Sequence, residues 1–154
     1  MHVAAHGEAS EDARKLDYAF RVAINGPLGY EFNVLSTSET AKATMRRQVE
    51  EYRQYEKLIL EGDFYRLLDP FATDCYAYYM VSEDNREILL TFLQNLDDPK
   101  ETAYKLKVSR ADKALTYRDT ISGKTYTGEE LKKGLVVNAD KAGLFSRMFH
   151  FVAE

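Results

Sequence analysis

The spacing of the apolar residues changes at Gly62 from a period of about 3.6 to a period of 2. Before Gly62, apolar residues recur three and four positions apart, and charged residues occupy the opposite side. The members of this apolar stripe are Met45, Val49, Tyr52, Tyr55, Leu58 and Ile59. Ser36 and Glu39 have the spacing of a capping box. The pattern predicts a helix over residues 38–61.

After Gly62 the chain alternates short apolar-polar segments with turn residues, which is typical of strands. The predicted strands are residues 64–68, 75–82, 86–96, 102–109, 115–121 and 145–152. Residues 88–93 are apolar on both faces, so that strand is expected to be central. Thr127 and Glu130 form a second capping-box pair, which predicts a short helix over residues 129–133. Residues 63–154 therefore read as an antiparallel β-sandwich.

The first part of the chain carries two short apolar runs, residues 2–5 and 18–24, separated by a charged loop over residues 8–15. Both runs are predicted to be strands, and Asn25-Gly26-Pro27 closes the second. Two strands without a hairpin turn do not form a self-sufficient sheet. Residues 1–62 are therefore expected to depend on another part of a protein.

Charge and composition exclude several classes of function. The 154 residues include 25 acidic and 21 basic residues, so the net charge is −4, which argues against nucleic-acid binding and against a polybasic membrane surface. The apolar stretches are far shorter than a membrane-spanning helix requires. A single cysteine excludes an internal disulfide and fits a reducing compartment. The N-terminus has no secretion signal, so a cytoplasmic protein is expected.

Few residues have the spacing of a metal or cofactor site. His2 and His6 lie four residues apart, but the local pattern is strand and loop, so neither a metal site nor a cofactor is expected. His150 alternates with phenylalanines and is expected on the less buried face of its strand. Cys75 has no basic neighbour and is interpreted as an inert packing residue.

Residues 122–125 read Ser-Gly-Lys-Thr, which resembles the end of a phosphate-binding loop. The glycine that the motif requires five residues before its second glycine is Arg118 here. A hairpin turn is therefore the preferred interpretation.

The aromatic run over residues 76–79 is the one feature that suggests binding. Tyr76 and Tyr78 are candidates for stacking against sugar rings. The alternative is that the two faces of this strand contact the opposite sheet and a neighbouring domain. The alternative is favoured because consecutive strand residues point to opposite faces and cannot share one platform.

The sequence becomes specific over residues 48–71, and above all at Gly62-Asp63-Phe64-Tyr65-Arg66-Leu67-Leu68. This segment resembles the junction after the catalytic barrel in the family 36 glycoside hydrolases, the α-galactosidases. The resemblance extends through residues 80–84, 128–131 and 145–152, and upstream through residues 2–3, 22–23 and 29–32. The chain departs from the family at the loop from His6 to Asp12, which in the family lies at the mouth of the barrel. The resemblance therefore does not assign an exact substrate preference.

The resemblance implies a fold class and a domain order. The family has an N-terminal β-sandwich, a central (β/α)8 barrel and a C-terminal antiparallel domain. The expected fold is accordingly α+β: residues 1–62 supply the terminal strands and last helix of the barrel, and residues 63–154 form the C-terminal antiparallel β-sandwich. Both catalytic aspartates of the family precede the matched region, so the resemblance assigns no catalytic residue to this chain.

The expected function follows from that resemblance. The chain would be the C-terminal part of an enzyme that hydrolyses terminal α-galactosides such as melibiose or raffinose. It would support the barrel and assembly, would be inactive alone, and would meet a galactoside only in the complete enzyme. Its expected partners are the rest of the barrel or like subunits, and the severed surface is expected to promote self-association. The alternative is a free-standing carbohydrate-binding or scaffold module.

Overall fold

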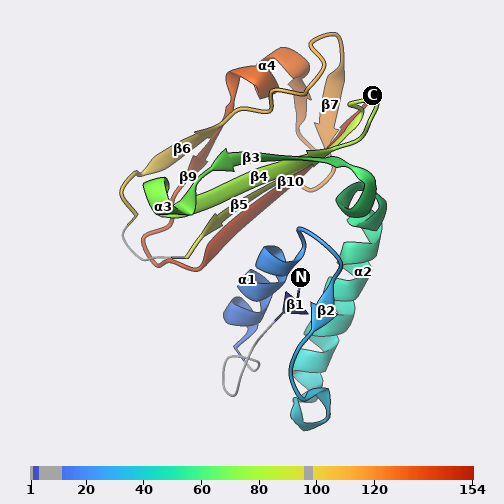
Figure 1. The fold of residues 1–154 in the computed structure, drawn as a ribbon, viewed down its shortest axis with the longest axis vertical. Helices are drawn as coiled ribbons and strands as arrows, with labels where there is room; N and C mark the ends of the chain where they lie inside the picture. The colour runs from blue at the N-terminus through green and yellow to red at the C-terminus, as the bar shows by residue number, and fades with distance from the viewer. Residues whose placement is uncertain (1, 4–11, 96–98) are drawn as a thin grey trace. The chain divides into compact units, whose positions relative to one another are not determined.

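A computed structural model describes residues 2–3, 12–95 and 99–154 of the chain (Figure 1). The chain divides into two compact units, Met1–Leu60 and Glu61–Glu154. The first unit carries two helices and a short strand pair, and the second carries most of the strands.

The first unit alternates strands and helices. Its order is β1 (His2–Val3), α1 (Ala13–Ala23), β2 (Gly29–Tyr30), a 3-10 turn (Val34–Ser36) and α2 (Glu39–Glu61). Strands β1 and β2 pair in parallel, with Val3 opposite Tyr30. Parallel neighbours need a crossover connection, and α1 provides it.

Helix α1 corrects the sequence prediction, because residues 18–24 were expected to form a strand. The helix buries Leu16, Phe20 and Ala23, which lie at the i, i+4 and i+7 positions of one face. The carboxylate of Asp12 caps its start by accepting from the backbone N–H groups of Arg14 and Lys15. The apolar run looked continuous from residue 18, but its buried positions follow helical spacing. The predicted loop over residues 8–15 therefore ends early, and residues 4–11, including His6, lie outside the described residues.

Helix α2 confirms the prediction for residues 38–61. Its buried residues form one face, which consists of Ala41, Met45, Gln48, Tyr52, Tyr55, Leu58 and Ile59. The predicted capping box of Ser36 and Glu39 is wrong, because Glu39 is the first residue of the helix and its carboxylate pairs with Lys42 and Arg46. Ser38 rather than Ser36 caps the first turn, and its hydroxyl accepts from the N–H of Ala41 at 3.2 Å.

The second unit contains two antiparallel sheets. The larger sheet has the order β3-β4-β5-β10-β7-β8, and a two-stranded sheet joins β6 to β9. The strands of the larger sheet are β3 (Asp63–Leu68), β4 (Cys75–Val81), β5 (Glu87–Gln94), β7 (Thr116–Asp119), β8 (Thr125–Thr127) and β10 (Phe145–Ala153). The smaller sheet consists of β6 (Ala103–Leu106) and β9 (Leu135–Asn138), and the helices of this unit are α3 (Pro70–Thr73) and α4 (Gly128–Lys133).

The two sheets share one hydrophobic core. Ala77, Tyr79, Leu90 and Phe92 enter it from the larger sheet, and Leu106 enters it from the smaller one. Strand β6 alternates between the two faces: Tyr104 and Leu106 are buried, and the residues between and beside them are exposed. Strand β5 lies between β4 and β10 and is buried on both faces, which confirms its predicted central place.

The capping box of Thr127 and Glu130 is confirmed at the start of α4. Residues 122–125 belong to the hairpin between β7 and β8, as the preferred interpretation of the Ser-Gly-Lys-Thr run expected. The prediction missed strands β2, β8 and β9 and the short helix α3, each of which has four residues or fewer. The mixed helical and antiparallel fold is confirmed, and the assignment of residues 1–62 to a barrel stays a prediction.

Candidate functional site

Three features of the described residues could carry binding or chemistry: an aromatic cluster on β3 and β4, a polar network at His150, and a groove on α2. Each lies within one of the two compact units. No helix in the described part of the chain is both long enough and apolar enough to cross a membrane. Within residues 2–3, 12–95 and 99–154, no group of three His, Cys, Asp or Glu side chains could hold a metal ion.

The aromatic cluster contains both sequence-predicted binding residues. The rings of Tyr76 and Tyr78 lie 5.4 Å apart, and the ring of Phe64 stacks on Tyr78 at 5.3 Å. The guanidinium of Arg66 lies 5.9 Å from the centre of the Tyr76 ring. Strand alternation places Tyr76 and Tyr78 on one face of β4. The core residues of this strand lie on the other face, and they are Cys75, Ala77, Tyr79 and Val81.

The two tyrosines differ in their access to solvent. Tyr78 is 0% exposed, and Tyr76 is partly exposed. A sugar needs an open ring face to stack against, so Tyr76 is the better placed of the two candidates. Phe64 extends the cluster toward solvent, because 46% of its surface is exposed. Its place in the edge strand β3, next to β4, brings Phe64 to this cluster.

A buried polar network joins three elements of the second unit. The ring of His150 on β10 lies between two partners: its Nδ1 is 2.7 Å from Thr120 Oγ1, and its Nε2 is 2.9 Å from Glu87 Oε1. The carboxylate of Asp119 accepts from the backbone N–H groups of His150, Ile121 and Ser122. These contacts hold the β7–β8 turn against β10 and β5. His150 is 9% exposed, whereas Phe149 and Phe151 are 4% and 0% exposed and belong to the shared hydrophobic core. Its predicted place on the less buried face of the strand is therefore confirmed.

Cys75 is buried, as a packing residue should be. Burial raises the pKa of its thiol above the ordinary value, which lowers the fraction of reactive thiolate. The prediction that Cys75 packs in the core is confirmed by its membership of the shared hydrophobic core.

The groove lies on α2, where Tyr30 of β2 closes one side. It has a volume of about 420 Å³, and its lining residues are Tyr30, Lys42, Met45, Arg46, Val49, Glu50 and Arg53. The Tyr30 hydroxyl donates to Oε1 of Gln48 at 2.8 Å, which holds the ring in place. Burial and the neighbouring Asp17 carboxylate raise the pKa of Tyr30 above its ordinary value. Glu50 is the single carboxylate among the lining residues.

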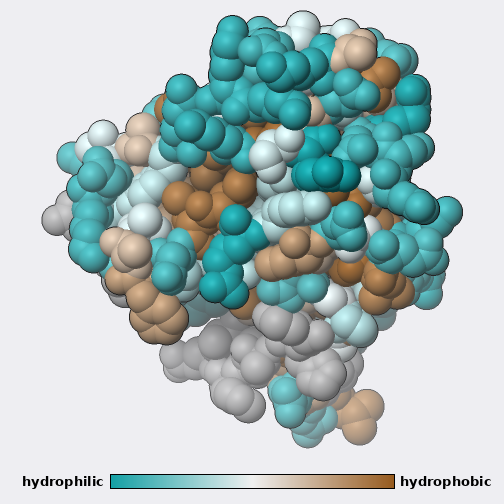
Figure 2. Space-filling model, turned by 45° about the horizontal axis from the view of Figure 1, so that its top comes forward, coloured by the Kyte–Doolittle hydropathy of each residue, from teal (hydrophilic) through white to brown (hydrophobic). Residues whose placement is uncertain are grey.

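The surface of the molecule is mostly hydrophilic in the view of Figure 2, where apolar residues appear as separate small areas. Large apolar side chains remain exposed at Leu35, Leu60, Phe64, Phe71, Ile121, Val136 and Val152.

Comparison with known sequences identifies the second unit. Residues 75–151 match the profile of the glycosyl hydrolase family 36 C-terminal domain. The chain is 34% identical over 110 residues to the α-galactosidase AgaA of Geobacillus stearothermophilus, a match that covers 71% of this chain and 15% of the relative. It is also 30% identical over 109 residues to the bifunctional α-galactosidase/sucrose kinase AgaSK of Mediterraneibacter gnavus, covering 71% of this chain and 12% of that protein.

Solved structures agree with the sequence match. The crystal structure of AgaA superposes with a TM-score of 0.82 at 30% identity, over 90% of this chain and 19% of AgaA. A variant of AgaA in complex with stachyose superposes with a TM-score of 0.85 at 28% identity, over 99% of this chain and 21% of AgaA. The chain spans about a fifth or less of the length of the relatives that it matches. It belongs to glycoside hydrolase family 36 and carries the family's C-terminal domain.

Proposed function

We propose that this chain is the C-terminal part of an α-galactosidase and that it completes and supports the catalytic barrel without cleaving substrate itself. The observation that carries the proposal is the structural match to AgaA, which extends over 99% of this chain and therefore includes both compact units. Variants of AgaA have been solved in complex with raffinose and with stachyose, so the proposed substrates of the complete enzyme are α-galactosides of this kind.

The first unit has the order expected at the end of a (β/α)8 barrel. Strand β1, helix α1, strand β2 and helix α2 follow one another, and the two strands are parallel. A barrel of this class repeats that strand-helix unit eight times. Two parallel strands cannot close a barrel, so the proposal requires further strands from the rest of the enzyme.

The proposed lack of activity in isolation rests on the chemistry of glycoside cleavage. A retaining glycosidase needs two carboxyl groups about 5 Å apart. The groove on α2 is lined by one carboxylate, Glu50. The carboxylate of Asp119 already accepts hydrogen bonds from three backbone N–H groups and serves to hold a turn. We therefore propose no catalytic residue in this chain.

The proposed setting is the cytoplasm, with the remainder of the barrel or like subunits as partners. The single cysteine of the sequence supports a reducing compartment, because extracellular domains of this size often depend on disulfides. The exposed Phe64 and Phe71 of the second unit support a docking role, since large exposed apolar side chains favour contact with another protein surface.

A chimera tests the proposal. The matching C-terminal segment of AgaA is replaced by these 154 residues, and the release of galactose from raffinose is measured for the chimera, for the isolated chain and for AgaA truncated before the segment. The chimera is expected to hydrolyse raffinose, and the isolated chain and the truncated AgaA are expected to be inactive. Hydrolysis by the isolated chain, or a folded chimera without activity, would overturn the proposal.

A further inference from the structure

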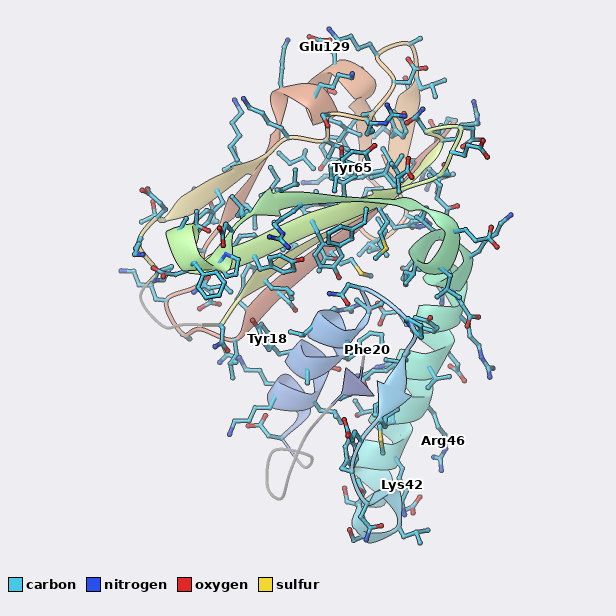
Figure 3. All side chains as sticks on the ribbon, viewed as in Figure 1. Tyr18, Phe20, Lys42, Arg46, Tyr65 and Glu129 are labelled. Carbon is cyan, nitrogen blue, oxygen red and sulfur yellow. The ribbon has the colours of Figure 1, made fainter. Side chains whose placement is uncertain are left out.

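One face of α2 is shaped to receive another helix. Lys42, Arg46, Val49 and Arg53 follow one another at spacings of three and four residues, and Met45 and Glu50 lie beside them on the same face. Together they line the groove, and Lys42 and Arg53 lie about 16 Å apart along the helix axis, which equals about three helical turns. Figure 3 shows Lys42 and Arg46 on the same stretch of α2.

The floor of the groove is apolar and preformed. Met45, Val49 and the ring of Tyr30 provide it, and Met45 is 6% exposed. The Tyr30 hydroxyl is held by Gln48, so the ring does not have to be ordered when a partner binds. A preformed apolar floor beside a helix is what ridges-into-grooves packing of a second helix requires.

The groove lies on the side of α2 that α1 does not occupy. On the α1 side, Gln48 donates to Oδ1 of Asp17 at 2.7 Å, and Glu51 forms an ion pair with Arg21. At 3.6 residues per turn, Val49 and Arg53 lie more than about 120° around the helix from the midpoint of Gln48 and Glu51. A helix in the groove would therefore be a second neighbour of α2 and would not compete with α1.

The rim of the groove is mainly basic. Lys42, Arg46 and Arg53 line it together with one acidic residue, Glu50. Glu39 pairs with Lys42 at 2.9 Å and with Arg46 at 3.9 Å from one end of the groove. The Glu39 side chain is 79% exposed, and exposed pairs of this kind are weak enough to be exchanged for a partner's carboxylates.

The strand next to the groove also has an open side. Strand β2 pairs with β1 in a two-stranded parallel sheet, so within the described residues its other edge has no strand partner. Parallel strands are normally buried in larger sheets, and each added strand brings a helix to the same layer. A strand added beside β2 would bring its helix to the side of α2 where the groove lies.

We propose that this groove binds an amphipathic helix with an apolar stripe flanked by carboxylates, supplied by the part of the enzyme that the relatives contain and these 154 residues do not. The inference rests on the proposed function and adds the identity of the contact surface and the charge of its partner. The carboxylates face Arg46 and Arg53, and the apolar stripe packs on Met45, Val49 and Tyr30.

Two synthetic peptides test the charge preference of the groove on the complete 154-residue chain. Both have about 20 residues, enough to be helical, and the same leucine stripe, but one has glutamates and the other lysines beside the stripe. The acidic peptide is expected to bind roughly tenfold more tightly than the basic one, and to shift the NMR signals of Met45, Val49 and Tyr30. Affinities are measured by fluorescence anisotropy.

Matched variants locate the binding. Arg53→Glu is expected to lower the affinity for the acidic peptide about fivefold. Lys57→Glu is the control: it changes the net charge by the same amount, but residue 57 is exposed on α2 outside the groove, so the affinity is expected to stay unchanged. Val49→Asp is expected to abolish binding of both peptides. Circular dichroism establishes that each variant retains its helices.

Several outcomes overturn the inference: failure of the acidic peptide to bind, equal affinity for both peptides, or equal effects of Arg53→Glu and Lys57→Glu. A dimer of the chain that Val49→Asp dissociates in sedimentation would assign the groove to a second copy instead. None of these results depends on raffinose hydrolysis. An active chimera, combined with equal affinity of the groove for the acidic and the basic peptide, would refute this inference and leave the proposed function intact.

Discussion

Nε2 of His150 lies 2.9 Å from Oε1 of Glu87, and this contact joins the neighbouring strands β10 and β5. The other ring nitrogen of His150 meets Thr120 at 2.7 Å, so the imidazole connects the centre of the larger sheet to the β7–β8 turn. A polar side chain that is as buried as His150 stabilises the fold only while its hydrogen bonds are satisfied.

Glu87→Ala should lower the free energy of unfolding by about 1 kcal/mol, because it removes one partner of a nearly buried imidazole. Urea denaturation measures the change. Glu83→Ala, in the exposed turn before β5, should change stability by less than about 0.5 kcal/mol. Glu87→Gln retains an acceptor oxygen and should recover part of the loss. Equal effects at residues 83 and 87 would show that the His150 contact contributes nothing.

Gly128→Ala should destabilise the second unit by about 3 kcal/mol. A Cβ atom at residue 128 would overlap the backbone carbonyl of Asp112. Hydrogen bonds hold both backbones in place, because the N–H of Gly128 donates to the carbonyl of Leu115 and the N–H of Leu115 donates to the carbonyl of Asp112. Gly123→Ala is the matched comparison: it has open space around it, and its positive φ should cost only about 1 kcal/mol. Thermal unfolding compares the two, and a smaller loss at residue 128 than at residue 123 would contradict the packing.

Tyr104 should contribute to stability in a way that disappears at alkaline pH. Burial raises the pKa of Tyr104 from 10.0 to about 12, and its hydroxyl donates to the carbonyl of Thr73 at 3.0 Å. Because the folded-state pKa is the higher one, the contribution is complete below pH 10 and is lost as the pH rises from 10 to about 12.

Tyr104→Phe tests this dependence. At neutral pH the variant should lose about 1 kcal/mol because the hydrogen bond to Thr73 is absent. The difference in unfolding free energy between wild type and variant should shrink as the pH rises above 10. Urea denaturation at a series of pH values measures it, and a difference that stays constant would refute the role of the buried hydroxyl.

Titration calorimetry with raffinose separates the proposed function from the alternative of a free-standing carbohydrate-binding module. The isolated chain should give no heat at millimolar raffinose, because Tyr78 is buried and Arg66 lies over the ring of Tyr76. Heat that is lost in Tyr76→Ala but kept in Tyr65→Ala, whose ring stacks on Tyr79 of the core, would favour the module instead.

Helix α2 and the central strand β5 could be predicted from the sequence because their patterns involve neighbouring residues. The stripe from Met45 to Ile59 repeats often enough to define a helical face, and residues 88–93 are apolar without interruption. Helix α1 could not be predicted in the same way, because residues 18–24 form an apolar run that suits either structure. Its contacts with β1 decide in favour of a helix.

The candidate sites show the same division. The sequence by itself determined the aromatic run at Tyr76, the resemblance to family 36 and the helical spacing from Lys42 to Arg53, since all three depend on residues close together in the chain. Only the tertiary structure decided that Phe64 covers Tyr78, that Glu87 meets His150 and that Tyr30 closes the groove on α2. Phe64 and Tyr78 lie 14 residues apart, Glu87 and His150 lie 63 residues apart, and Tyr30 and the groove residues of α2 come from different elements. Their contacts arise from strand register and packing, which no local pattern encodes.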